Sequence, residues 1–158
     1  MASEAGTARR DAVSSAGAKT PAQMYAYAVG GVLLLVGLLG FAADSAFDTG
    51  QGIDGGKLLG IFEVNGIHNL VHIASGLLLL AVAPKRATAR YGVIAFGLVY
   101  GLVTLIGLID GRDVLGLIPV NPADNVLHIA LTAGALLAGF LSPADDARTT
   151  RDNQRTVG

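Results

Sequence analysis

The chain has 158 residues, of which 52% are hydrophobic and only 15% are charged, and its formal net charge is −1. These values and a mean hydropathy of +0.56 argue against an ordinary soluble domain and provide no basic excess for nucleic acid. The absence of cysteine excludes disulfide bonds, thiolate metal ligands and a thiol nucleophile.

Four apolar blocks lie between the charged stretches, at residues 25–43, 67–83, 91–109 and 125–141. A hydrocarbon core of roughly 30 Å needs about 20 apolar residues in a helix, and the bilayer offers no partners for unpaired backbone groups. The sequence therefore predicts an all-α fold, a polytopic four-transmembrane-helix bundle over residues 24–142.

The basic residues predict the orientation of these helices. Nine of the eleven lie before the first block, between the second and third, or after the fourth. Under the positive-inside rule, both termini are expected in the cytoplasm. The polar segments 1–23 and 143–158 have too little apolar content to form a core, so we expect a disordered cytoplasmic arm and tail.

An internal repeat covers the entrances to the second and fourth blocks. Residues 59–74 return as residues 115–130, and eight of the sixteen positions are identical. Each repeat contains one of these segments and two of the predicted helices, so the second repeat enters the membrane in the same sense as the first. The pattern therefore predicts two parallel two-helix repeats, related by a pseudo-two-fold axis along the membrane normal.

Each copy places polar side chains on one helix face. Asn65, His68, Asn69 and His72 have spacings of three, four and seven residues, which bring them together at about 100° per residue. Such a face should point into the bundle, because exposing it to acyl chains is expensive. The second copy repeats the face with the residues Asn121, Asp124, Asn125 and His128.

The asparagines are expected to be structural. Asn65 and Asn121 stand where an N-cap is needed, and the segment Asn121-Pro122-Ala123-Asp124 resembles a capping box. Asn69 and Asn125 lie one turn deeper, where a hydrogen bond between helices is the expected role.

The histidines leave several interpretations open. His72 and His128 can be neutral structural histidines, or they can hold one haem b between them. They can also titrate as part of a proton relay. A fourth interpretation is a zinc or copper(II) site. Its ligands would be His68, His72, Asp124 and His128.

The paired segments 60–72 and 124–128 resemble the bacterial membrane family known as domain of unknown function 4383. Their shared pattern is Val-Asn followed by His-Asn-x-x-His or Asp-Asn-x-x-His. The resemblance covers approximately residues 22–142. It implies a multi-pass protein of the bacterial plasma membrane and provides no catalytic residue or cofactor to transfer.

We therefore expect a structural, accessory or binding component of the membrane rather than an enzyme, because no nucleophile and base stand together. The alternatives are a metal- or haem-binding redox protein and a small transporter or proton-linked component. Apart from these possibilities, no cofactor is expected. The expected partners are the lipid bilayer and either further copies of the chain or another membrane protein, with no nucleic acid.

Overall fold

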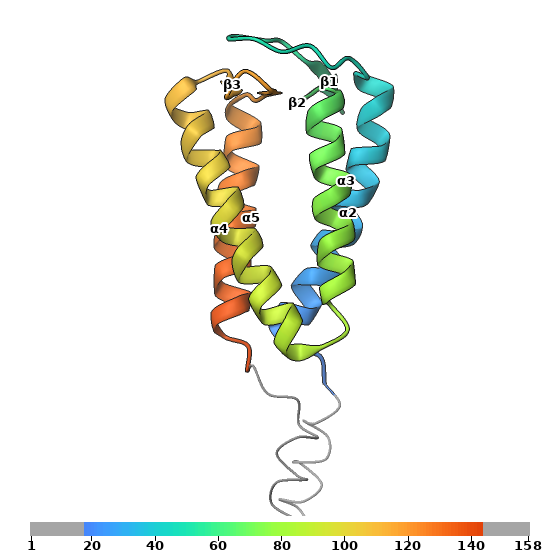
Figure 1. Ribbon diagram of the computed structural model, residues 1–158, viewed down its shortest axis with the longest axis vertical. Helices are drawn as coiled ribbons and strands as arrows, with labels where there is room; N and C mark the ends of the chain where they lie inside the picture. Colours follow the sequence, from blue (N-terminus) through green and yellow to red (C-terminus); the bar gives the residue numbers. More distant parts are fainter. Residues whose placement is uncertain (1–17, 144–158) are drawn as a thin grey trace, which may run out of the picture.

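The computed structural model describes residues 18–143, which form four helices and two short β-hairpins (Figure 1). The helices are α2 (Pro21–Ala43), α3 (Gly66–Val82), α4 (Arg86–Asp110) and α5 (Pro122–Phe140). The antiparallel strand pairs are β1 (Gly56–Leu58) with β2 (Phe62–Val64) and β3 (Asp113–Val114) with β4 (Ile118–Pro119). The remaining parts of the expected arm and tail, 1–17 and 144–158, lie outside the described residues.

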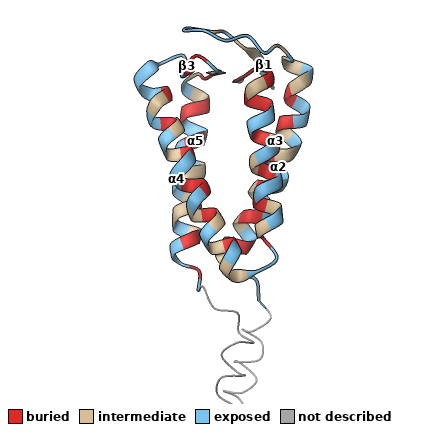
Figure 2. Cartoon of the chain, viewed as in Figure 1, coloured by how far each residue is buried: buried red, intermediate tan, exposed pale blue. Residues whose placement is uncertain are grey.

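The helices form two pairs. Helix α2 packs mainly on α3, and α4 packs mainly on α5. The start of α2 and the end of α5 lie at one end of the molecule, and both hairpins lie at the other (Figure 1). The buried positions lie mainly where the helices face one another (Figure 2).

The outward faces of the helices are apolar and exposed, which indicates a membrane protein. Leu35, Leu78, Leu98 and Leu137 are each more than half exposed, at 56%, 67%, 62% and 63%. A soluble protein would cover so extensive an apolar surface. Helices α2, α4 and α5 are long and apolar enough to cross a membrane, whereas α3 is apolar but has only 17 residues.

All four helices begin earlier than their apolar blocks predict, α3 by one residue and the other three by several. Helix α2 begins at Pro21, within the segment expected to be a disordered arm, because Thr20 and Gln23 form a capping box around its first turn. Helix α4 begins at Arg86 rather than residue 91, and α5 at Pro122 rather than 125. Hydropathy marks the stretch suited to lipid, while caps and proline determine where a helix begins.

The two hairpins are not predicted by the sequence pattern. In the first, Leu59 and Gly60 have φ angles of 53° and 72°, and the amide of Ile61 donates to the carbonyl of Leu58. In the second, Leu115 and Gly116 have φ angles of 58° and 68°. Two central residues at positive φ characterise a type I′ turn, which suits the twist of a two-stranded hairpin.

Small side chains pack together at the end of the bundle where α2 begins. Ala22, Ala26 and Ala89 are fully buried there, which lets the helices approach closely. The Gln23 side chain donates to the carbonyls of Ala83 and Pro84 at 3.1 and 3.0 Å, so it satisfies backbone acceptors at the end of α3.

Close contact between α2 and α3 depends on Gly37. A Cβ at this position would lie 2.8 Å from the carbonyl oxygen of Asn69 and 2.9 Å from the amide nitrogen of Ile73. We predict that Gly37→Ala lowers the free energy of unfolding by about 1–3 kcal/mol, because a helix backbone must move. Unfolding in mixed detergent and SDS micelles measures the change.

Gly31→Ala is the matched control on the same helix. A Cβ at Gly31 meets nothing within 4 Å, so this variant should be neutral or more stable by up to about 1 kcal/mol. Equal stability of the Gly37 and Gly31 variants would contradict the close packing of α2 on α3.

Candidate functional site

Asn65 and Asn121 cap the helices that carry the polar faces. The Asn65 side chain accepts a hydrogen bond from the amide of His68 at 2.8 Å. The Asn121 side chain accepts from the amides of Ala123 and Asp124 at 2.8 and 3.1 Å. Both caps satisfy backbone donors that have no partner within their own helix.

The same two asparagines also connect the helix pairs. Nδ2 of Asn65 donates to the carbonyl of Leu117 in the second hairpin at 3.0 Å, and Nδ2 of Asn121 donates to the carbonyl of Ile61 in the first at 2.8 Å. Each asparagine therefore caps its own helix with its oxygen and holds the opposite hairpin with its nitrogen.

The deeper asparagines are buried beside glycines. Nδ2 of Asn69 donates to the carbonyl of Asp44, directly after α2, at 2.9 Å. The Asn69 side chain occupies the space where a Cβ at Gly40 would lie. Oδ1 of Asn125 would lie 3.0 Å from a Cβ at Gly107 and has no hydrogen-bond partner.

Three histidines form a compact cluster between the two helix pairs, called here the His triad. His68 and His72 come from α3 and His128 comes from α5. Their ring centroids are separated by 4.4 Å for His68 and His72, 5.9 Å for His68 and His128, and 6.3 Å for His72 and His128. One ring nitrogen from each residue lies within 4.8 Å of the other two.

The His triad is buried and lacks hydrogen bonds at several nitrogens. His68, His72 and His128 are 2%, 8% and 4% exposed. Both ring nitrogens of His68 and Nδ1 of the other two have no hydrogen bond of normal geometry, although the backbone at Glu63 and Pro119 is close enough to His68 to interact with it. A buried polar group without a partner costs about 1–3 kcal/mol, so these nitrogens favour binding a further species.

The triad fits a single ion better than a haem. Three imidazole nitrogens are a ligand set that zinc and copper(II) accept. A porphyrin between His72 and His128 would need the space that the His68 ring takes up, 4.4 Å from one ring and 5.9 Å from the other. The geometry therefore favours the metal interpretation over the haem interpretation.

Asp124 lies apart from this arrangement. Its Oδ2 accepts from the amide of Asn121 at 2.9 Å, which completes the capping box, and from the amide of Glu63 at 3.0 Å. In the described part of the chain, the ligand atoms of the three histidines come together, and Asp124 is not part of that group. Its observed contacts join the second helix pair to the first hairpin.

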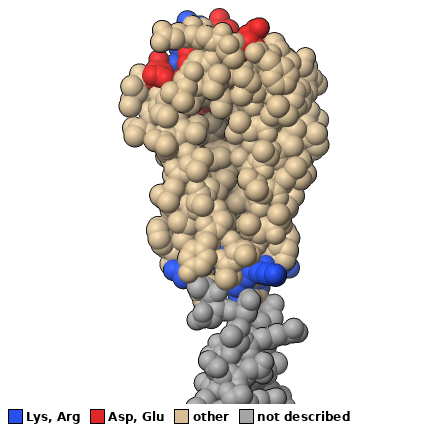
Figure 3. Space-filling model, in the orientation of Figure 1, with Lys and Arg blue, Asp and Glu red and all other residues tan. Residues whose placement is uncertain are grey.

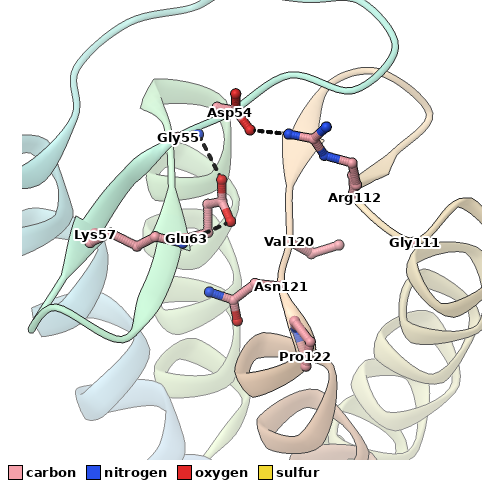
Figure 4. Close-up of a pocket in the computed structure, with 9 residues that line it drawn as sticks. All are labelled: Asp54, Gly55, Lys57, Glu63, Gly111, Arg112, Val120, Asn121 and Pro122. Carbon is pink, nitrogen blue, oxygen red and sulfur yellow. Dashed lines mark hydrogen bonds and ion pairs between the residues drawn. The ribbon is translucent and has the colours of Figure 1, made fainter.

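A polar cavity lies among the hairpin loops and the start of α5 (Figure 4). It has a volume of about 400 Å³, and its lining includes Lys57, Glu63, Arg112 and Asn121. Nζ of Lys57 lies 3.1 Å from the Glu63 carboxylate, and Arg112 pairs with Asp54 across the loops. Sequence spacing gives no sign of this cavity, because it does not show that the two hairpins meet.

Comparison with known families agrees with the sequence resemblance. The family model described as "Domain of unknown function (DUF4383)" matches residues 23–141. The chain belongs to this family. The match contains all four described helices except the first two residues of α2, and it confirms the family predicted from the two polar segments. No curated protein and no solved structure shows significant similarity to the chain.

Proposed function

We propose that this DUF4383 protein is a binding component of the bacterial plasma membrane, whose His triad holds one divalent transition-metal ion. The observation that carries the proposal is the convergence of three buried ring nitrogens within 4.8 Å, together with buried nitrogens that lack hydrogen-bond partners. His68, His72 and His128 would each supply one imidazole nitrogen. Asn65 and Asn121 would hold the two helix pairs at the separation that the ion requires.

The chemistry of the donor set favours zinc or copper(II). Neutral imidazoles suit both ions, and three protein ligands leave a fourth position for water or another small ligand. A bound ion would act as a Lewis acid, and copper could also act as an electron carrier. Because the rings are almost fully buried, the protein would hold the ion out of bulk water.

The proposed topology has four membrane crossings, with both termini in the cytoplasm. The described lysine and arginine residues near the start of α2 and the α3–α4 connection lie opposite the acidic hairpin end (Figure 3). Helix α3 spans about 26 Å at 1.5 Å per residue, and its hairpin can extend it to the headgroup level. In this proposed topology the His triad would lie toward the outer leaflet.

We also infer that the two helix pairs arose as parallel repeats. Positive-φ residues, N-cap asparagines and the cross-hairpin bonds all recur 56 positions apart, as in Asn65 with Asn121 and Ile61 with Leu117. This recurrence supports a pseudo-two-fold axis that passes close to the triad.

Accessibility of single cysteines tests the topology, because the chain has no native cysteine. We predict that Gln51→Cys reacts with an impermeant maleimide added outside intact cells, whereas Lys85→Cys reacts only after the cells are opened. Labelling of Lys85→Cys from outside, with Gln51→Cys protected, would reverse the proposed orientation.

Metal content tests the proposed site. Protein purified in mild detergent without a polyhistidine tag is expected to contain, or take up, close to one zinc or copper ion per chain. His72→Gln and His128→Gln should each weaken binding at least tenfold, since each removes one of three imidazole ligands. Elemental analysis after desalting gives the stoichiometry, and circular dichroism and size-exclusion chromatography monitor folding.

Asp124→Asn is the matched control for this experiment. The amide oxygen can still accept from the amides of Asn121 and Glu63, so folding and metal content should both remain. A folded wild-type protein that takes up neither zinc nor copper would reject the site. Full retention of metal in a folded His72→Gln/His128→Gln variant would do the same.

A further inference from the structure

An apolar groove lies between helices α3 and α4, which belong to different helix pairs. Its volume is about 300 Å³. Leu78 and Val99 are among its lining residues and are 67% and 58% exposed, so the groove opens toward the surrounding lipid. The molecule is visibly hollowed between the two helix pairs in the space-filling view (Figure 3).

The groove contains two polar residues and borders the His triad. Ser75 lies three residues after His72 on α3, and the ring of Tyr100 lies 5.6 Å from the ring of His128. Tyr100 is 5% exposed and its hydroxyl has no hydrogen bond of normal geometry, although the Ser75 side chain is close enough to interact with it. The groove therefore carries one buried hydroxyl, of Tyr100, and one half-buried hydroxyl, of Ser75, beside unpartnered imidazole nitrogens.

The depth of these hydroxyl donors in the bilayer favours an uncharged ligand. Tyr100 is ten residues from the end of α4 at Asp110, or about 15 Å at 1.5 Å per residue, which places it near the centre of the bilayer. A charged phospholipid headgroup is expensive at that depth. Hydroxyl donors within an apolar groove instead suit a neutral molecule that carries a carbonyl acceptor.

The aromatic residues of the lining favour a ligand that has a flat ring. The rings of Phe96 and Tyr100 both border the groove, with centroids 4.0 Å apart and planes inclined at 31°. These two rings pack against each other, and the parts that border the groove favour edge-to-face or offset contact with a further planar ring. A volume of about 300 Å³ is at the lower end of small-molecule sites and suits one ring with the first part of its tail.

We propose that the groove between α3 and α4 binds an isoprenoid quinone, with a quinone carbonyl accepting from Tyr100 and Ser75. The isoprenoid tail leaves past Leu78 and Val99 into the lipid. The proposal goes beyond the metal site and does not require an ion in the triad. It adds a membrane-dissolved ligand that would lie next to the triad.

Binding of decylubiquinone to the full chain in lipid nanodiscs tests this proposal. We expect saturable binding in excess of empty nanodiscs, measured by separating the discs and quantifying the quinone by chromatography. Val99→Trp should abolish the excess by filling the groove, and Tyr100→Phe should weaken it about tenfold by removing one hydrogen-bond donor.

Matched controls lie on the same helix. Leu98→Trp adds the same bulk at a 62% exposed position outside the groove lining, and Tyr91→Phe removes a hydroxyl from a 62% exposed tyrosine. Both variants should bind decylubiquinone like the wild type. No excess over empty nanodiscs, or unchanged binding by a folded Val99→Trp variant, would overturn the proposal.

Zinc content measured on the same nanodisc samples separates the two proposals. Val99→Trp should lose the quinone and keep the metal, because Val99 contributes no metal ligand. Loss of metal by His72→Gln with quinone binding retained would support independent sites. Absence of quinone binding from a metal-loaded wild type would reject this inference while leaving the metal site standing.

Discussion

The structure depends on a constraint that the bilayer imposes: polar groups within it must find partners inside the protein. The first turns of helices α3 and α5 present polar side chains on one face. These are asparagine and histidine on α3, and asparagine, aspartate and histidine on α5. Turning these faces toward lipid would leave several donors and acceptors unpaired. The two helix pairs therefore bring these faces together at the hairpin end, where the histidines meet in one cluster.

The hairpins make this meeting possible. Their type I′ turns direct the chain back over the helix entrances, and the carbonyls of Ile61 and Leu117 then accept from Asn121 and Asn65. One residue type thus serves two purposes, since its oxygen caps a helix and its nitrogen joins the halves. Asp124 adds a third link through the amide of Glu63.

Much of this arrangement could be predicted from local sequence. Apolar length indicates the helices, the Asn-Pro-Ala-Asp segment indicates a capped start, and helical spacing places His68 and His72 on one face. The capping box of Thr20 and Gln23 could also be predicted from local sequence, although it adjoins a polar segment that we expected to be disordered.

Other features depend on tertiary structure and could not be predicted in this way. The hairpin turns use Leu-Gly instead of the usual Asn-Gly or Asp-Gly, so composition gives little sign of a type I′ turn. The repeat aligns Asp124 with His68, yet the structure gathers His68 with the other histidines and directs Asp124 to backbone amides. Equivalent positions in a repeat need not share a role once their neighbours differ.

X-ray absorption at the zinc edge shows whether the three imidazoles bind one ion together. The sample is tag-free protein loaded with one equivalent of zinc and desalted. We expect about three imidazole nitrogens at roughly 2.0–2.1 Å from the ion, with the multiple scattering that imidazole rings produce. A shell of oxygen ligands alone, or protein that retains no zinc, would contradict it.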